Sequence, residues 1–525
     1  MHNDVQLFQT NPPSVCFHEL VTGAGADRNL RHSGLLVLQA RRPDNGYGTI
    51  ALSNPSIRVA HWDNKNRGGI VVRIAIVGLA SLGILASACD SARKDEGPEP
   101  FASRYQPLES ETTLLRGATV LTGTGERLDG ADVLMKDGRI VAVGSGVSDD
   151  DATVVDATGR WITPGIIDTH SHLGVYASPG VQSHSDGNEI TGAVTAEVWA
   201  EHGVWPHDPG FITALAGGVT SMQILPGSAN LIGGRSVTVK NIPGRNVQEM
   251  KFPGAPYGLK MACGENPKRI YGSRFQSPFT RMGNVAGYRS AWIKAADYRD
   301  KMAAAAEGEG EAPMRDLQLE TLVGVLDGEI LVHNHCYRGD EMSVMIDIAE
   351  EFGYEISSFH HAVEAYKVAD LLAEHDICAS VWADWWGFKM EAYDGIRENA
   401  ALVDRAGACA IIHSDSDLGI QRLNQETAKV MGAAARVGID IPPEQAIRWI
   451  TKNPAKSMGI LDQTGTLEPG KMADVVVWSG NPFSVYTKAD LVYVDGALAW
   501  DRSSPDTNPV TDFSLGTAIQ TGGAQ

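Results

Sequence analysis

The sequence predicts an α/β protein, namely a (β/α)8 TIM-like barrel with a small β-sandwich formed from both flanks of the chain. Three observations lead to this prediction. Strand-like and helix-like segments alternate through the middle of the chain, as repeated β–α units require. Short β-rich runs with tight Gly-Asp and Asp-Gly turns stand on either side of that middle. Side chains that can bind a metal follow several of the middle strands, at the end where such barrels hold their active sites.

The barrel is expected at residues 166–462. Helices are predicted at 208–217, 315–327 and 341–352, and a strand-like run follows each of them. In the third helix, apolar residues recur three and four positions apart, which gives the helix one apolar face. Gly353 comes directly after it, and glycine is the usual residue at a helix end.

The sandwich is expected from residues 112–165 together with 463–505. The first flank contains runs such as TTLLRGATVLTG and ADVLMKDGRIVAVG, and the second contains ADVVVWSG and LVYVDGALAWD. Both flanks consist of short β-rich runs separated by turn signals, so one shared sheet domain is the simplest interpretation. The remaining residues, 506–525, are predicted to be a flexible tail.

The segment 71–89 has the layout of a secretory signal, with an Arg, then an apolar run, then small residues before Cys89. Its end, ASAC, resembles a bacterial lipoprotein processing site; the alternatives are a plain signal peptide and a buried apolar segment. We therefore expect export to the bacterial cell envelope, with a lipid on Cys89 that anchors the protein at the periplasmic side of the inner membrane. Residues 90–111 are predicted to be a linker. Residues 1–70 show no periodic apolar pattern and are predicted to be disordered or an over-extended start of the gene.

The formal net charge of −20 argues against nucleic-acid binding, because phosphates would be repelled. A small-molecule substrate is expected instead, and a homo-oligomer stays open. None of the six cysteines forms a CxxC pair. Their spacing is irregular, which favours free thiols over a disulfide framework for the last four. These are Cys263, Cys336, Cys378 and Cys409.

Metal-capable side chains end four of the predicted barrel strands. His170 and His172 end WITPGIIDTHSH, His335 ends EILVHNH, His361 ends YEISSFHH, and Asp415 ends ACAIIHSD. Two residues that are two positions apart on a strand point to the same face, so the first two imidazoles should converge. Imidazole and carboxylate ligands suit a divalent ion, most simply Zn²⁺. The sequence therefore predicts one or two divalent ions at the mouth of the barrel.

Two motifs extend this prediction through a resemblance. PGIIDTHSHLG resembles the first-strand signature of the metal-dependent amidohydrolase superfamily, and GTLEPGKMADVVVW resembles its C-terminal return into the sandwich. The resemblance covers about residues 112–505. Within the superfamily, the sequence is most similar to the imidazolonepropionase-like and Xaa-Pro-dipeptidase-like branch. It implies a His pair on the first strand, a bridging residue on the third or fourth, one His each on the fifth and sixth, and an Asp on the eighth.

The resemblance leaves a choice on two strands. On the fifth, His333 and His335 face the same way, and His335 is preferred because it lies last on the strand. On the sixth, His360 and His361 are expected to point to opposite faces, so only one should enter the barrel. His361 is preferred, because it stands where the family has its His-Gly step, with Ala362 in place of Gly. Asp415 matches the eighth strand.

The bridging ligand has two candidates in YGLKMACGEN. Lys260 lies in an apolar strand, and burial there would lower the pKa of its amine, which favours uptake of CO₂ to give a carboxylated lysine. Glu265, just beyond the strand, could supply a carboxylate directly. The alternative for Lys260 is a lysine whose amine extends to solvent, and the alternative for Glu265 is a loop glutamate that binds no metal.

These parts predict a hydrolase that acts on C–N bonds of amides, peptides or cyclic amides through a metal-activated water. Asp415 would take the proton of the water and pass it to the leaving nitrogen, and His335 would help stabilise the oxyanion. Tyr337, Arg338 and Glu189 are candidates for binding the substrate. The alternatives are a deaminase with the same activated water and a non-catalytic barrel that serves as a binding protein. Several other residues are assigned to walls, core or structural positions: Trp382, Trp385, Trp386, His202, His207, His375 and His413.

Overall fold

The computed structural model describes residues 101–504 and two further strands nearer the amino terminus. The chain divides into two compact units, residues 1–96 and 97–525. In the first unit, β1 (Leu35–Arg41) pairs antiparallel with β2 (Tyr47–Ser53), so part of the stretch expected to be disordered is described as a hairpin. The predicted signal segment, 71–89, and the predicted tail, 506–525, lie outside the described residues.

The second unit is built around an eight-stranded sheet in which strands that follow one another in the chain are also neighbours in space. Its strands are β8 (Ile166–Ser171), β9 (Val219–Ile224), β10 (Ile232–Lys240), β11 (Gly258–Ala262), β12 (Leu331–Cys336), β13 (Ile356–His361), β14 (Cys378–Val381) and β15 (Cys409–Ile412). Just beyond the end of β15, the amide of Asp415 donates to the carbonyl of His170, which lies in β8, at 3.0 Å. This bond brings the two edges together, so the sheet is nearly closed and resembles a barrel.

The regular alternation of strand and helix is interrupted at β10, which runs antiparallel to both β9 and β11. Only residues 225–231 connect β9 to β10. Parallel neighbours need a crossover of a dozen or more residues, whereas antiparallel neighbours can be joined by a short loop. The short PGSANL connection therefore accounts for the reversed strand. The other neighbouring pairs in this sheet are parallel.

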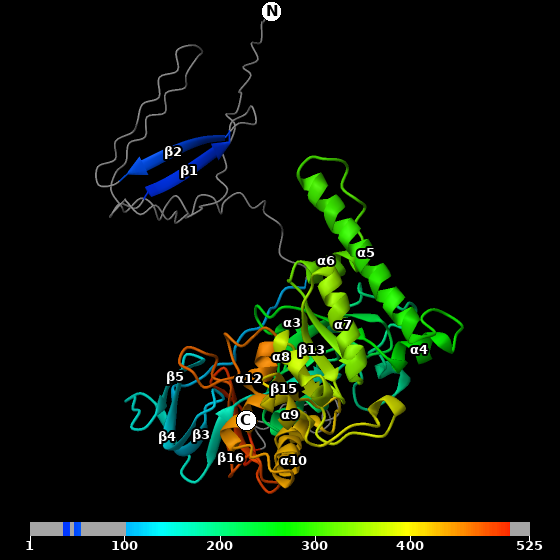
Figure 1. Ribbon diagram of the computed structural model, residues 1–525. Helices are drawn as coiled ribbons and strands as arrows, with labels where there is room; N and C mark the ends of the chain where they lie inside the picture. Colours follow the sequence, from blue (N-terminus) through cyan, green and yellow to red (C-terminus); the bar gives the residue numbers. More distant parts are fainter. Residues whose placement is uncertain (1–34, 42–46, 54–100, 505–525) are drawn as a thin grey trace, which may run out of the picture. The chain divides into compact units, whose positions relative to one another are not determined.

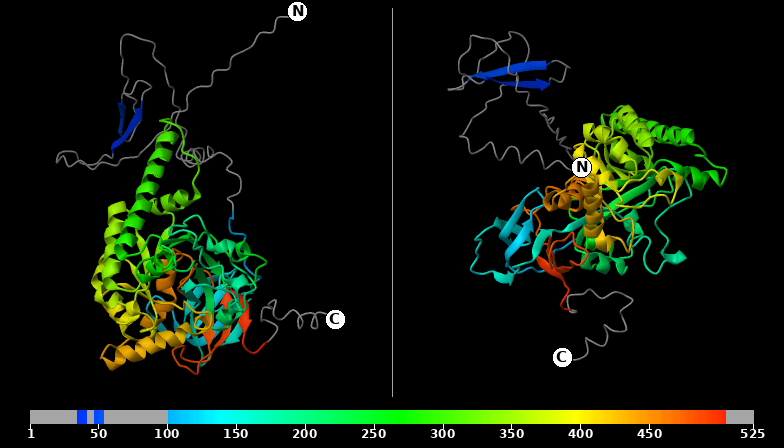
Figure 2. Two further views of the ribbon diagram at one scale, coloured as in Figure 1. Left: turned by 90° about the vertical axis from the view of Figure 1, so that its right-hand side faces the viewer. Right: turned by 60° about the horizontal axis from the view of Figure 1, so that its bottom comes forward.

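Helices lie between most of the barrel strands, and α5 projects beyond the elements around it (Figure 1, Figure 2). Their bounds are α2 (Gly210–Ala216), α3 (Val247–Met250), α4 (Glu265–Gly272), α5 (Arg281–Ala306), α6 (Leu317–Leu326), α7 (Gly339–Phe352), α8 (Ala369–Glu374), α9 (Asn399–Arg405), α10 (Leu423–Arg436), α11 (Pro443–Ala446) and α12 (Lys452–Ser457). Helix α7 buries the apolar face predicted for it, and Gly353 ends it in the left-handed conformation that glycine adopts without strain. Asp316 caps α6, because its side chain accepts from two amides of the first turn.

The two flanks of the chain share a second eight-stranded sheet. Its strands are β3 (Thr113–Leu121), β4 (Arg127–Lys136), β5 (Arg139–Gly144), β6 (Thr153–Asp156), β7 (Trp161–Pro164), β16 (Val475–Trp478), β17 (Ala489–Val494) and β18 (Ala497–Asp501). The flanks meet where β7 pairs antiparallel with β16 along their whole lengths. Apolar side chains from both flanks, including Val120, Ile162 and Val475, form one buried cluster. Residues more than 300 positions apart in the chain therefore fold as one sheet.

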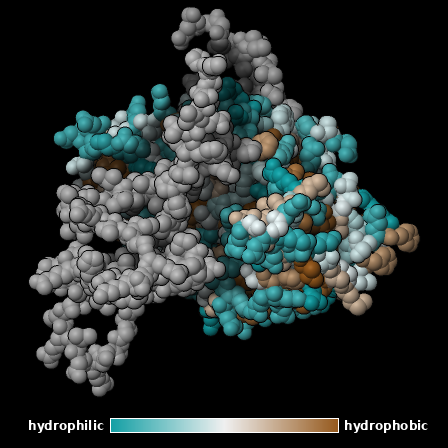
Figure 3. Space-filling view, turned by 90° about the horizontal axis from the view of Figure 1, so that it is seen from above, coloured by the Kyte–Doolittle hydropathy of each residue, from teal (hydrophilic) through white to brown (hydrophobic). Residues whose placement is uncertain are grey.

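The described surface mixes polar and apolar side chains. Seen from above, its hydrophobic side chains stand in small groups among hydrophilic ones (Figure 3). Among the described residues, no helix has both the length and the apolar character needed to cross a membrane.

The prediction of free thiols is corrected for four cysteines. Cys263 pairs with Cys336, and Cys378 pairs with Cys409, each as a disulfide between neighbouring barrel strands or their ends. Cys378 and Cys409 are direct partners in the register of β14 and β15, with their Cα atoms 4.3 Å apart. Strand register, rather than spacing along the chain, makes these pairs, so the irregular spacing carried no information about them.

Candidate active site

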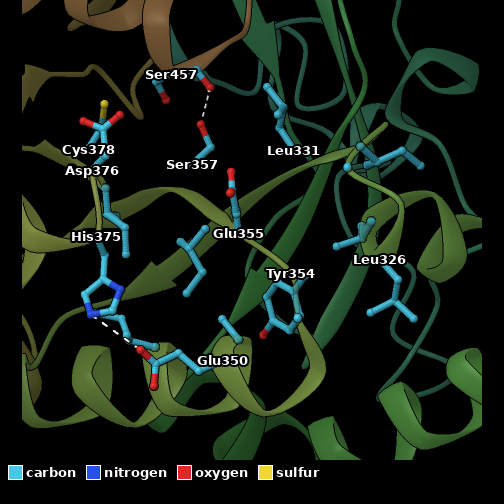
Figure 4. A pocket seen from close by; sticks show the side chains of 18 of the residues that line it. Leu326, Leu331, Glu350, Tyr354, Glu355, Ser357, His375, Asp376, Cys378 and Ser457 are labelled. Atoms are coloured by element: carbon cyan, nitrogen blue, oxygen red, sulfur yellow. Dashed lines mark hydrogen bonds and ion pairs between the residues drawn. The ribbon is translucent and has the colours of Figure 1, made fainter. Parts of the chain in front are cut away.

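Two cavities lie near opposite ends of the barrel strands. The larger, about 850 Å³, opens at the amino ends, where Leu331, Ile356 and Cys378 begin β12, β13 and β14. Figure 4 shows this cavity, with His375 paired to Glu350 on its wall. None of the predicted metal ligands lines it. The candidate active site is therefore the second cavity, about 610 Å³, at the carboxyl ends of the strands.

The predicted ligands of the first and last barrel strands meet in this second cavity. His170, in β8, and His172, directly after it, have their Nε2 atoms 3.3 Å apart. Oδ1 of Asp415 lies 3.5 Å from the first of these nitrogens and 3.3 Å from the second. The loop that carries Asp415 is fixed because the amide of Ser414 donates to Asp168 Oδ1 at 3.1 Å. Two imidazoles and a carboxylate thus converge as a small metal site would need.

The preferred residues of β12 and β13 line the same cavity. The rings of His335 and His361 have their centroids 4.6 Å apart, and His361 Nδ1 lies 3.8 Å from Asp415 Oδ2. Asn266 lies 3.3 Å from Nε2 of His335. The sequence reasoning did not single out Asn266, whose position next to Glu265 was the only signal for it.

The expectation that only one of His360 and His361 enters the barrel is wrong. Nδ1 of His360 lies 2.9 Å from Nδ1 of His170, while His361 also faces the cluster. Alternation holds for extended backbone, but His361 has a φ of 69°, which turns its side chain back to the same side. His360 in turn contacts His333 Nδ1 at 2.9 Å. His333 and His360 therefore form a buried chain behind His170, outside the cavity.

Of the two bridging candidates, Lys260 reaches the cluster. Its side chain is fully buried on β11, and its Nζ lies 3.3 Å from Nε2 of His170. Burial lowers the pKa of its amine to about 7. Glu265 begins α4, does not line the cavity, and lies 4.0 Å from the Nζ of Lys389.

The electrostatics favour neutral imidazoles beside an ionised carboxylate. Burial, followed by the nearby charge of Lys260, holds the pKa of His170 well below its usual value. Burial likewise lowers the pKa of His335 and of His361. Burial alone would raise the pKa of Asp415, but its hydrogen bond to His172 and the surrounding positive charge lower it overall. Neutral histidines and an ionised aspartate are the protonation states that bind metals.

The three predicted substrate-binding residues lie in different parts of the structure. Tyr337 lines the candidate site. Arg338 forms a bidentate pair with Asp340, with both bonds at 2.8 Å, and does not line the cavity. Glu189 lies at a smaller cavity of about 270 Å³ beside the loop after β8. Of the three, only Tyr337 is therefore placed to contact a molecule bound in the candidate site.

One wall of the cavity comes from the segment after β14, which the sequence reasoning assigned to wall or core. It carries Trp382, Trp385, Trp386 and Phe388. Lys389 follows them, and its Nζ donates to Tyr337 Oη at 3.0 Å and to the side-chain oxygen of Asn266 at 2.8 Å. The sequence reasoning missed Lys389, because a loop lysine has no periodic pattern that distinguishes it.

His413 also belongs to the cluster, although it was assigned a structural role. A nitrogen of His413 lies within 4.8 Å of ligand nitrogens of both His170 and His361. The available signal was its position two residues before Asp415, which predicts the same face of the strand.

Comparison with known proteins assigns the chain to a family. Residues 301–513 match the sequence model of the amidohydrolase family. The crystal structure of an amidohydrolase from Thermotoga maritima MSB8 is 38% identical, with a TM-score of 0.69, and the match covers 74% of this chain and all of that chain. The chain thus shares its overall fold with a solved amidohydrolase. The chain belongs to the amidohydrolase family of hydrolases.

Two further relatives extend the comparison. The amidohydrolase tasK of Hapsidospora irregularis is 32% identical over 439 residues, which cover 76% of this chain but only 44% of that protein. The imidazolonepropionase of Mesorhizobium japonicum is 26% identical over 383 residues, which cover 69% of this chain and 88% of that protein. The chain therefore spans less than half the length of one of its relatives and most of the length of the other.

Proposed function

We propose that this protein is a metal-dependent hydrolase of C–N bonds in amides, peptides or cyclic amides. One observation carries the proposal: His170, His172 and Asp415 bring their ligand atoms within 4.8 Å of one another at the carboxyl ends of the barrel strands. Membership of the amidohydrolase family supports it. We also propose that the nearly closed sheet is the TIM-like barrel of this class, with β10 reversed, and that the flank sheet is its sandwich domain.

The donor set fits a divalent metal. His170, His172, His335, His361 and Asp415 would hold one or two Zn²⁺ ions. Nitrogen donors with one carboxylate are the ligands that zinc prefers. Buried nitrogens also lack other partners: Nδ1 of His361 and of His335 make no hydrogen bond within the described residues. A bound ion would satisfy groups that are otherwise costly to bury.

Lys260 would bridge two such ions after carboxylation. With a pKa of about 7, a large fraction of its amine is neutral near neutral pH. The amine lone pair forms the new N–C bond to CO₂, and one proton is released, which leaves a carbamate anion. Nζ already lies 3.3 Å from a nitrogen of His170, so the anion would form beside the proposed ligands.

When bound, the metal would lower the pKa of a water molecule and polarise the carbonyl under attack. Asp415 would serve as the base for the attacking water, because its carboxylate lines the cavity and stays ionised. It can then deliver the proton to the leaving nitrogen. His335 lines the same cavity, where it would donate to the developing oxyanion.

The test compares two site variants with one remote control. His170→Ala should lose metal and nearly all turnover while the fold survives, because a residue at a strand end is a ligand rather than core packing. Asp415→Asn keeps the shape of the side chain, so its turnover should fall steeply with little change in metal content. His375→Ala, at the opposite cavity, should resemble the wild type. Metal is measured by elemental analysis, and activity is measured on dipeptide, N-acyl amino acid and cyclic-amide libraries.

Two results would decide against the proposal. Full metal content and wild-type turnover in His170→Ala would remove the site assignment. Release of ammonia from amino-substituted rings, with no cleavage of amides or peptides, would identify a deaminase instead. Cyclic amides are screened first, because the match to an imidazolonepropionase covers most of that relative.

We further propose that the protein is exported and carries a lipid on Cys89, which would anchor it at the periplasmic side of the inner membrane. The disulfides Cys263–Cys336 and Cys378–Cys409 support export, because such bonds persist in oxidising compartments. Cys89→Ala should abolish lipid processing and release the protein from membranes. Unchanged processing and membrane association in that variant would contradict the anchor.

A further inference from the structure

His413 is a buried histidine whose two ring nitrogens have no hydrogen-bond partner within the described part of the chain. It directly follows β15 and is 1% exposed. A buried polar group without a partner destabilises the fold. Nearly all buried polar groups in folded proteins are hydrogen-bonded or bind an ion or water. The two free nitrogens of His413 therefore point to a bound group.

The neighbours of these nitrogens are themselves metal-capable. Ligand nitrogens of His170, His361 and His413 lie within 4.8 Å of one another. The ring of His413 lies 5.1 Å from that of His170 and 5.0 Å from that of His361, measured between centroids. Two nitrogens bound to one zinc ion are at most about 4 Å apart, since each Zn–N bond is about 2.0–2.1 Å. The three nitrogens, all within 4.8 Å of one another, are therefore close to that separation.

Bulk solvent does not supply the missing partner. Trp382 stacks on His361 with ring centroids 4.1 Å apart, and its ring lies 5.4 Å from that of His413. The tryptophan is itself almost buried, and His413 does not line the cavity.

We infer that His413 is a further metal ligand, which shares an ion with His170 and His361. The inference rests on the proposed metal-dependent function and adds a ligand that the resemblance to the amidohydrolase superfamily does not supply. An additional neutral imidazole makes the site richer in nitrogen. It therefore favours a late first-row ion such as Zn²⁺ over Mg²⁺ or Ca²⁺, which prefer oxygen ligands.

The first test uses the unaltered full chain. Crystals are grown with zinc, and anomalous scattering at the zinc edge locates each ion. We expect one ion at about 2.0–2.1 Å from a nitrogen of His413. An ion held by His170 and His172, with both nitrogens of His413 beyond about 3 Å, a distance outside Zn–N bonding, would overturn this inference while the proposed function stands. Zinc absent from the whole cluster would overturn both.

The second test measures affinity for zinc by competition with a chelator. His413→Asn should weaken binding by more than the roughly 10- to 100-fold that is typical of residues that only support a ligand. His375→Asn, at the opposite cavity, is the matched control and should bind zinc as the wild type does. The Co²⁺-substituted His413→Asn protein should also show a changed visible spectrum, which a purely structural residue would not alter. Wild-type affinity and spectrum in His413→Asn would overturn the inference. If His413→Asn does not fold, the anomalous maps of the wild type decide alone.

Discussion

Replacement of Lys240 by methionine should greatly destabilise the second unit. Lys240, at the end of β10, is fully buried, and its Nζ donates to both carboxylate oxygens of Asp474 at 2.7 and 2.9 Å and to Asp495 at 2.9 Å. Both aspartates belong to the flank sheet region, adjoining β16 and β17. A single cation thus joins the two sheets. Methionine keeps the length and apolar character of the stem but removes the charge.

The magnitude follows from what remains after the substitution. Removing one partner of a buried ion pair costs about 3–5 kcal/mol, because the other charge stays buried without compensation. Here two carboxylates lose the same cation. Thr464, which donates to Asp474 at 2.7 Å, offsets little, because it carries no charge. We therefore expect a loss at the upper end, about 5 kcal/mol in the free energy of unfolding.

The loss depends on pH with a definite sign. Burial, and then repulsion from Asp474, raises the pKa of Asp495 in the folded protein, and Lys240 opposes both effects. Without Lys240 the folded-state pKa rises further above the unfolded value of about 3.9. A carboxyl with a raised folded-state pKa favours folding below the unfolded pKa, and that benefit is lost as pH rises through the folded pKa. The difference between variant and wild type should therefore shrink as pH falls toward 4.

Urea unfolding at pH 7, followed by tryptophan fluorescence, measures the loss. Lys301→Met is the matched control, because that lysine is exposed and pairs with Asp297 on the surface of α5. It should lose no more than about 0.5 kcal/mol. A loss below about 1 kcal/mol in Lys240→Met, or a loss equal to that of the control, would refute the reasoning.

Three further predictions address the disulfides, the first unit and the cavity. Cys409→Ser removes the disulfide to Cys378, which closes a loop of 31 residues, so the free energy of unfolding should fall by about 3–4 kcal/mol. An unchanged urea midpoint in the oxidised protein would contradict this. A chain that starts at residue 90 should keep the melting temperature and turnover of the full chain, because residues 1–96 form a separate unit; a clear loss of either would show that they support the enzyme. Lys389→Met should raise KM more than it lowers kcat for N-acyl amino acids, because the ammonium makes two hydrogen bonds among the described residues and has a third N–H for a substrate carboxylate; equal KM values would remove that role.

Periodicity allowed much of the barrel to be predicted. The helix expected at 341–352 is α7, Gly339–Phe352, because its apolar face and its terminal glycine agree. The reversal of β10 could have been predicted as well. The connection of residues 225–231 is too short for a parallel crossover. The repeated β–α units elsewhere in the chain nevertheless led to the prediction of a regular barrel in which all strands are parallel.

The candidate site was harder to predict, because local backbone conformation decides where side chains point. Alternation along a strand correctly brings His170 and His172 together. The same rule fails at His361, since a positive φ is not visible in the residue type. Lys389 and Asn266 are 123 positions apart in the chain and come into contact only through tertiary folding. No local sequence pattern predicts this contact.

The site and the closure of the barrel are made by the same residues. Within the described chain, no ladder of hydrogen bonds pairs β8 with β15, the two outer strands of the barrel sheet. The seam between them is formed instead by the bond from the Asp415 amide to the His170 carbonyl and by the bonds from Ser414 to Asp168. An ion held by side chains of His170 and Asp415 would add a direct link across this seam. Because ligands that bind only the folded state stabilise it, the proposed metal would serve closure of the barrel as well as catalysis.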